Sequence, residues 1–350
     1  MARSVLSDLA RQRMTYTNEG YRDALEALRL LPPGNSPVPN AVGDQELFEA
    51  AIFSRILKPY RFGLHPLRIA KTRPHPDHLV LVIDGTEELI FDVLRDLLPV
   101  SGRDGDDVHG VEGLRIRRWR DDGLDLHQPG RRTLVRLAGA PRAVWRRVEQ
   151  QIASDLAGSE YLPCWRTHPE VWTDNERSQQ DDEGSSFIRL ARSGAWLASG
   201  LLRRIAVFHT TAIPWAADGW RGLSSRLLWK FDLACYPDLP MRMEELAAVL
   251  TDPRFGLPLL ANPRSPGSPN MLRLSARDGE EALELHFAAW EADGDQWMAD
   301  PGRVRSVRDR AERVATREPR RSTAPRCGSC GARQAASTYG FSTHEGEKRC

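Results

Sequence analysis

The sequence is poor in cysteine. Its 350 residues contain five, and these are scattered along the chain: Cys164, Cys235, Cys327, Cys330 and Cys350. Small secreted domains that depend on disulfides for stability carry far more cysteine in regular spacings. The sequence therefore excludes a disulfide-stabilised scaffold.

Long apolar segments are also missing. No stretch approaches the roughly 18 apolar residues that cross a bilayer. Residues 1–13 carry several charges and lack the apolar core of a secretory signal. Together with the scarcity of cysteine, these absences predict a cytoplasmic protein.

Lysine is rare, with four residues against 45 arginines. Arginine, alanine, glycine and proline have GC-rich codons, so the composition indicates a GC-rich and hence bacterial genome rather than a demand for guanidinium chemistry. The formal net charge is only +1. Any attraction to nucleic acid or to an acidic partner must come from a local patch.

The sequence also lacks the common catalytic and nucleotide-binding motifs: the P-loop, the G-x-G-x-x-G turn, the G-x-S-x-G elbow and the H-E-x-x-H pair. Asp84-Gly85-Thr86 follows an apolar run and resembles the end of the D-x-D-G-T element of haloacid-dehalogenase-like phosphatases. Val82 stands where the nucleophilic aspartate belongs, which excludes phospho-enzyme chemistry. We expect Asp84 to cap the following helix instead.

Hydrophobic periodicity predicts an α+β protein that begins with a helical segment, residues 1–62. Apolar residues recur at helical spacing near Val5–Leu9, in Tyr21–Leu28 and in a third helix over Gln45–Leu57. We expect this segment to pack as a cap on the next domain. Half of a helical DNA-binding unit and a dimer contact are the alternatives.

Two small sheet-plus-helix units are expected next. The first, residues 63–165, has predicted strands at Leu79–Ile83, Leu114–Trp119 and Thr133–Leu137, with helices over Glu87–Leu98 and from Pro141 to Leu156. An acidic, polar stretch, residues 166–186, is predicted to be a linker or loop.

The second unit covers residues 187–300. Its predicted helix is Met241–Leu250, and Asp278-Gly279 indicates a hairpin near its end. Its expected strands are Trp196–Leu202, Ile205–Thr210, Leu227–Ala234, Met271–Ser275 and Leu283–Phe287.

The last segment, residues 301–350, is a basic low-complexity tail with 12 Lys and Arg against 5 Asp and Glu. It contains the sharpest motif of the chain, Cys327-Gly328-Ser329-Cys330. With His344 and Cys350 it forms the pattern C-x2-C-x13-H-x5-C, which predicts a structural zinc knuckle with all four positions filled by protein. Two thiols in a disordered tail are the alternative.

The same tail carries a cluster of arginines. Arginines around a small rigid nodule suit contact with a phosphate backbone or an acidic protein. The candidate nucleic-acid-binding residues are Arg313, Arg317, Arg320, Arg321, Arg326 and Arg333.

Weaker candidates lie in the two units. His75 and His78 flank Asp77 in a proline-rich loop, which we interpret as a polar loop before a strand, with a metal site as the alternative. His209 is expected at the end of an apolar strand, where catalytic groups often emerge. Trp215, Trp220 and Trp229 are interpreted as core residues, with a stacking platform as the alternative.

These observations favour a non-enzymatic binding or accessory protein whose basic tail touches nucleic acid or an acidic partner. The first alternative is an enzyme of unrecognised class with a cleft between the two units near His209 and Trp215. The second is an assembly or structural subunit that uses its tryptophans and N-terminal helices for protein contacts.

Overall fold

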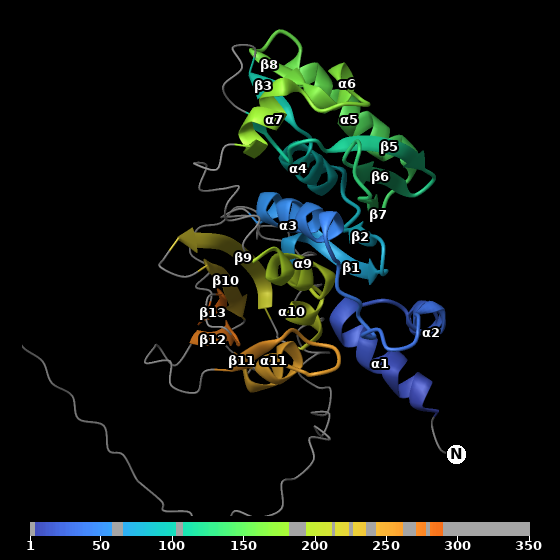
Figure 1. Ribbon diagram of the computed structural model, residues 1–350, viewed down its shortest axis with the longest axis vertical. Coiled ribbons are helices and arrows are strands. Elements are labelled where there is room, and N and C mark those ends of the chain that lie inside the picture. The colour runs from blue at the N-terminus through green and yellow to red at the C-terminus, as the bar shows by residue number, and fades with distance from the viewer. Residues whose placement is uncertain are drawn as a thin grey trace, which may run out of the picture. The chain divides into compact units, whose positions relative to one another are not determined.

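The computed structural model describes residues 4–57, 66–102, 108–181, 194–211, 214–223, 227–235, 243–261, 271–277 and 281–289. These residues form an α+β fold with two five-stranded sheets, a small three-stranded sheet and flanking helices (Figure 1). Within them, no helix is both long and apolar enough to cross a membrane. The predicted fold class is confirmed.

Three helices open the chain, as predicted: α1 (Val5–Thr17), α2 (Tyr21–Leu30) and α3 (Asp44–Ile56). Ser4 caps α1 through its side chain, and Asn18 ends it in the left-handed conformation. In α3, Glu49 is buried while Leu47 is only partly buried. The buried Glu49 has a partner, Arg203, which the periodicity of α3 alone does not reveal.

The first large sheet has the strand order β1-β2-β7-β6-β5. Only β2 and β7 are parallel; the other neighbours are antiparallel. Its strands are β1 (Ile69–Pro74), β2 (Leu79–Ile83), β5 (Arg115–Arg120), β6 (Gly123–His127) and β7 (Val135–Ala138), and its helices are α4 (Glu87–Leu97) and α5 (Arg142–Leu156).

One face of this sheet is the core face. It carries buried apolar side chains from the inner strands, and Trp145 and Val148 of α5 belong to the same hydrophobic cluster. The expected cap of α4 was wrong: the Thr86 side chain, not Asp84, accepts the hydrogen bond from the Leu89 amide. The core-face residues include Leu79, Leu81, Ile83, Leu124, Leu126, Val135 and Leu137.

A three-stranded sheet accompanies the first unit, formed by β3 (Val100–Gly102), β4 (Val108–His109) and β8 (Tyr161–Pro163). Helices α6 (Cys164–Thr167) and α7 (Asp174–Asp181) follow. Residues 166–181 were expected to be part of a linker or loop, yet they include helix α7, and Glu176 in that helix is fully buried. A buried ion pair anchors them, as described below.

The second large sheet has the order β11-β12-β13-β10-β9, in which only β10 and β13 are parallel. The predicted hairpin is confirmed, because β12 and β13 pair antiparallel. The strands are β9 (Pro214–Leu223), β10 (Leu227–Cys235), β11 (Leu259–Ala261), β12 (Met271–Ala276) and β13 (Glu281–Ala289), with helix α11 (Met243–Leu250) between β10 and β11.

Two expected strands were wrong. Residues 196–202 lie in helix α9 (Ala195–Arg203), and residues 205–210 include helix α10 (Val207–Thr210). Nearly every residue of α9 is buried, so its sequence is apolar all round. A continuous apolar run cannot by itself distinguish a buried strand from a buried helix.

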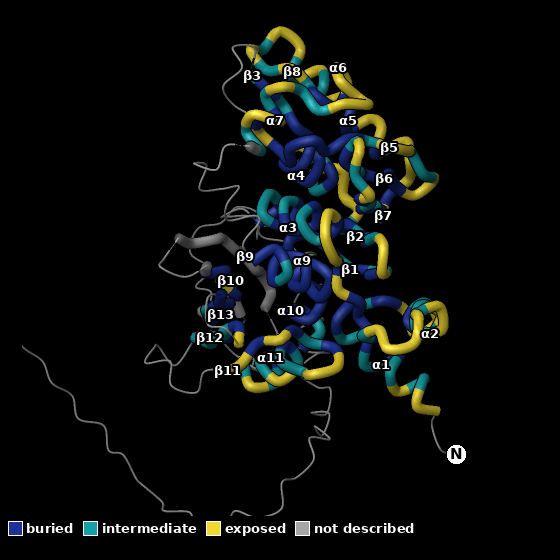
Figure 2. The backbone as a smooth tube through the Cα atoms, in the orientation of Figure 1, coloured by how far each residue is buried: buried dark blue, intermediate teal, exposed yellow. Residues whose placement is uncertain are grey.

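The hydrophobic core continues from the first sheet to the second (Figure 2). Helices α3 and α9 pack against each other, and the Phe53 ring of α3 lies 5.0 Å from Trp229 and 6.1 Å from Phe231 of β10. The Arg203 guanidinium of α9 donates to both carboxylate oxygens of Glu49 at 2.6 and 2.7 Å. The described residues all lie within one compact unit, residues 1–317.

Candidate functional site: the outer face of the first sheet

The face of the first sheet opposite the core carries a concentration of basic side chains. Directly paired residues of neighbouring strands point to the same side of a sheet, as do residues two apart on one strand. The pairing of β1, β2, β7, β6 and β5 therefore defines two complete rows on this outer face. The first row is Arg73, Val80, Arg136, Asp125 and Arg118, and the second is Lys71, Val82, Ala138, Gly123 and Arg120.

These ten positions hold five basic residues and one acidic residue. Arg118 is exposed, and Lys71, Arg73, Arg120 and Arg136 are partly exposed. The formal charge of the two rows is thus +4 in a protein whose total is +1. The outer face is therefore a local basic surface, which the net charge of the whole chain does not reveal.

Asp125 holds two of these arginines in place. Its side chain is only 3% exposed; Arg120 reaches one carboxylate oxygen at 2.6 Å, and Arg136 donates to the other at 2.8 Å. Burial raises the pKa of Asp125, but the hydrogen bonds from the two guanidinium groups outweigh it and keep the pKa below its usual range. One anion is shared by two cations, so positive charge remains on the surface.

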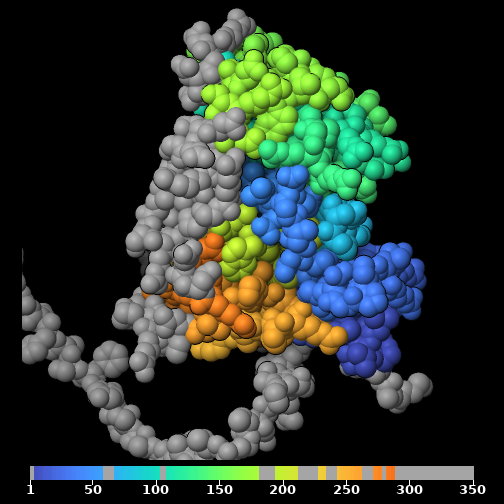
Figure 3. Space-filling model, viewed as in Figure 1, coloured from blue at the N-terminus to red at the C-terminus, as the bar shows by residue number. Residues whose placement is uncertain are grey.

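The basic groups lie mainly on the edge strands. Lys71 and Arg73 belong to β1, and Arg118 and Arg120 belong to β5. Four strand spacings of about 4.8 Å separate these edges, roughly 19 Å in all. On the β1 side, Asp23 of α2 accepts a hydrogen bond from Arg73 at 3.2 Å, and the β1–β2 hairpin lies beside the N-terminal helices (Figure 3).

The centre of the outer face is small and apolar: Val80, Val82, Ala138 and Gly123. None of the ten positions carries an aromatic ring or a carboxamide. Aromatic rings stack on unpaired bases, and carboxamides read base edges by paired hydrogen bonds. The chemistry of this face is therefore contact with anionic groups rather than base reading.

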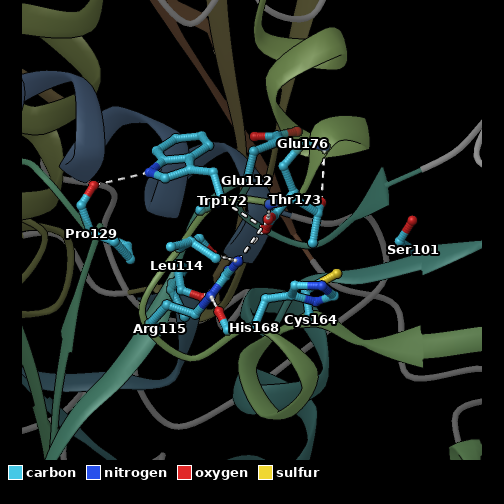
Figure 4. Close-up of polar contacts among 12 residues, drawn as sticks. Ser101, Glu112, Leu114, Arg115, Pro129, Cys164, His168, Trp172, Thr173 and Glu176 are labelled. Carbon is cyan, nitrogen blue, oxygen red and sulfur yellow. Dashed lines mark hydrogen bonds and ion pairs between the residues drawn. The ribbon is translucent and has the colours of Figure 1, made fainter.

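The third row of the same face is covered. Arg115 pairs with His127 across β5 and β6 and is fully buried beneath residues 168–176. Its guanidinium donates to both Glu176 oxygens at 2.9 and 2.7 Å and to the carbonyls of His168 and Val171 (Figure 4). This arginine is neutralised and unavailable to a ligand.

Glu176 is equally saturated. It also accepts hydrogen bonds from the amides of Gly113 and Thr173 at 2.9 and 2.8 Å. Burial raises the pKa of Glu176, whereas the Arg115 hydrogen bonds and these amides lower it more, so the pKa lies below its usual range. With its oxygens committed to Arg115 and two amides, Glu176 anchors α7 to the sheet; it is not a reactive group.

Trp172 completes the cover at this end of the face. Its indole donates to the Pro129 carbonyl at 3.0 Å, and the Arg131 guanidinium lies 4.9 Å from its ring (Figure 4). A Cβ on Gly113 would lie 2.3 Å from the Trp172 ring, so only glycine fits there. The cover is closely packed over the third row. The first two rows are called the open rows below, because their five basic side chains are exposed or partly exposed.

The predicted His75–His78 loop forms the β1–β2 hairpin, next to the first row. The two rings stack at 4.1 Å, and His78 Nδ1 lies 2.8 Å from Asp77. Burial, His78 and Arg13 lower the pKa of His75 to about 4, so it is neutral near pH 7. Parallel stacked imidazoles do not direct their nitrogens to one point, and within the described residues no group of three or more His, Cys, Asp or Glu could hold a metal ion.

The remaining predicted site residues fall in two classes. The predicted zinc ligands Cys327, Cys330, His344 and Cys350 lie outside the described residues, as do all six tail arginines. His209, expected at a strand end, lies instead in α10 and is buried. Trp229 is a core residue, as interpreted, and the side chains of Trp215 and Trp220 lie outside the described part.

The basic face could not be predicted from the sequence. Alternation over residues 114–119 indicated a half-exposed strand, but the alternation is interrupted at Arg117. The pairing shifts between Ile116 and Arg118, which is a β-bulge. Because of the bulge, Arg118 shares the outer face with Arg115, although their separation of three predicts opposite faces.

Comparison with protein families, with curated proteins and with solved structures finds no match to this chain. The chemistry of its residues is accordingly the basis for assigning a function.

Proposed function

We propose that this protein is a non-catalytic binding protein that contacts nucleic acid through the outer face of its first sheet and its basic C-terminal tail. The observation that carries the proposal is the pair of open rows with five basic side chains and a single acidic one. A surface of this kind attracts the phosphate backbone by releasing condensed counterions.

The composition of the face supports a sequence-independent mode of binding. Phosphate contacts position a protein on nucleic acid, whereas base contacts specify the sequence. The central Val80, Val82, Ala138 and Gly123 offer no hydrogen-bonding side chain. We therefore expect affinity that depends strongly on salt and weakly on sequence.

The tail extends the same chemistry. It holds 12 Lys and Arg against 5 Asp and Glu, and it includes the six candidate arginines and the cysteine motif. Its proposed role is to add phosphate contacts to those of the sheet face. The proposed structural zinc at Cys327, Cys330, His344 and Cys350 would order those arginines.

The test is duplex DNA binding by fluorescence anisotropy across a series of salt concentrations. Each phosphate contact contributes about 0.9 to the slope of log K against log salt. The double variant Lys71→Ala and Arg118→Ala removes one exposed or partly exposed cation from each edge of the face, so we expect the slope to become shallower by about 2. Deletion of residues 301–350 is expected to make it shallower still.

A matched control keeps the charge change constant. Arg254→Ala and Arg277→Ala remove two exposed arginines far along the chain from the first sheet, and they should leave the slope within error. Equal binding by the wild type, the face variant and the tail deletion would refute the proposal. An absence of DNA binding by the wild type at low salt would also refute it.

A further inference from the structure

We infer that residues 69–138 and 214–289 are two copies of one β-β-α-β-β-β module, and that only the first copy binds the polyanion, so that each chain holds one nucleic-acid segment. This inference rests on the proposed function. It adds the number of nucleic-acid segments bound per chain and identifies the outer face of the second sheet as a surface that does not bind them.

The duplication follows from the strand topology. The first sheet has the order β1-β2-β7-β6-β5, and the second, taken from its other end, has the order β9-β10-β13-β12-β11. Numbered within each copy, both sheets have the order 1-2-5-4-3. The match is complete from edge to edge.

Strand directions agree as well. In each copy the second and fifth strands are parallel, and every other neighbouring pair is antiparallel. A helix joins the second strand to the third in both: α4 in the first copy and α11 in the second. Each of these helices carries two consecutive glutamates in its first turn, Glu87-Glu88 and Glu244-Glu245.

The leading helices extend the correspondence. Helix α3 precedes β1 and helix α9 precedes β9, and these two helices pack side by side (Figure 1). Contact between corresponding elements is the arrangement of a symmetric dimer, here within one chain. The two copies differ mainly by an insertion: β3 and β4 lie between α4 and β5 of the first copy.

The outer faces of the two copies have different charges. On the second sheet the register places Lys230, Glu284 and Arg273 in one row and Asp232, His286 and Met271 in the next. Trp229, Phe231 and Leu285 occupy the opposite, core face. The two copies are compared over their first, second, fourth and fifth strands. In the second copy these positions hold two basic residues and three carboxylates, since Asp218 of β9 pairs with Asp232, which gives a formal charge of −1. The same strands of the first copy hold Lys71, Arg73, Arg136 and Asp125, a formal charge of +2.

The basic groups of the second face are also occupied. Glu284 is 8% exposed and lies 3.3 Å from Lys230, 3.8 Å from Arg273 and 2.6 Å from His286. Burial raises the pKa of Glu284, and the His286 and Lys230 hydrogen bonds lower it below the usual range. Here one carboxylate engages every basic group in its row, so no excess positive charge remains for a phosphate backbone.

The test uses the full chain and a labelled DNA duplex of about 12 base pairs, roughly 40 Å long. A titration at protein concentrations well above the dissociation constant measures stoichiometry, which needs no variant. We expect one duplex per chain. Two duplexes per chain would overturn the inference while leaving the proposed function intact.

Paired variants locate the contact. Lys71→Glu with Arg118→Glu should weaken binding by roughly tenfold or more, since two phosphate contacts become repulsive. Lys230→Met with Arg273→Met, which keeps the apolar stems, should leave the affinity within about twofold. Thermal melts show whether each variant is folded.

The remaining outcomes separate the two claims. If the second pair weakens binding as much as the first, both copies bind and the inference is wrong. If the wild-type chain binds no duplex at low salt, the proposed function fails, and the assignment of binding to the first copy fails with it.

Discussion

We expect Asp125 to have opposite effects on stability and on the proposed binding of nucleic acid. Its carboxylate fixes Arg120 and Arg136, and it is also the only negative charge in the two open rows. A residue with a purely structural role would change stability alone, so a single substitution separates the two roles.

Replacing Asp125 with Asn removes the charge but keeps the shape. We expect the free energy of unfolding to fall by about 1.5–3 kcal/mol, because hydrogen bonds to a charged group are lost. DNA affinity at low salt should rise, because the face gains one net positive charge. Chemical denaturation and anisotropy measure the two effects.

The exposed residue Asp121 provides the control for this substitution. Asp121→Asn should change the free energy of unfolding by no more than about 0.5 kcal/mol. Weaker DNA binding by the Asp125→Asn variant, with its fold retained, would contradict the assignment of this face as the contact surface.

At the scale of elements, a buried ion pair anchors α7 to the first sheet. Arg115 on β5 and Glu176 on α7 are both fully buried, and the Glu176 side chain also bonds the Thr173 amide at the start of the helix. A polar eight-residue helix is marginal by itself. The pair acts together with the hydrogen bonds of Asn175 to Ser101 and of Gln179 to Val108, and residues 168–181 therefore cover one end of the outer face rather than forming a free linker.

Substitution of Glu176 by Gln should lower the free energy of unfolding by about 3–5 kcal/mol, since it leaves the Arg115 charge buried and unpaired. Urea denaturation measures the change. Asp174→Asn is the matched control: Asp174 lies on the same helix and pairs with Arg177, but its side chain is 97% exposed. The control should stay within about 0.5 kcal/mol of the wild type.

The same pair gives a pH dependence with a defined sign. The pKa of Glu176 is lower in the folded protein than in the unfolded chain, so its contribution is present above about pH 4.3 and is lost as the pH falls through the lowered value. The Glu176→Gln variant should lose this part of the acid-induced decline. An unchanged decline below pH 4.3 would contradict the role of the pair.

At the scale of the whole molecule, α3 connects the two sheets. Phe53 of α3 is fully buried and contacts Trp229 and Phe231 of the second sheet, and α3 also packs against α4 of the first unit. A continuous core favours a single cooperative unfolding transition.

Phe53→Ala should lower the free energy of unfolding by about 3–5 kcal/mol through the cavity it leaves. Tryptophan fluorescence and far-ultraviolet circular dichroism should still report one coincident transition. Tyr21→Ala, which truncates an exposed ring on α2, is the control with a small effect. Two separate transitions in the wild type would show that the two copies unfold independently.

Much of the fold could be predicted from the sequence. The N-terminal helices, the apolar run of β2, helices α4, α5 and α11, and the β12–β13 hairpin follow from local patterns of hydrophobicity and turn residues. The α+β class follows from their order. These features are local, because a periodic apolar pattern determines which faces of a helix or strand are buried.

The tertiary structure alone decided the rest. The run over residues 195–203 is buried on nearly all sides, and a buried strand has the same composition, so the packing of α9 against α3 and β1 decides that it is a helix. The basic face depends on the bulge near Arg117 and on the pairing of strands that are far apart in sequence. The ion pair of Arg115 with Glu176 likewise joins two elements that are far apart in sequence. The identical order of the two sheets is a property of strand pairing, which spacing along the chain does not encode.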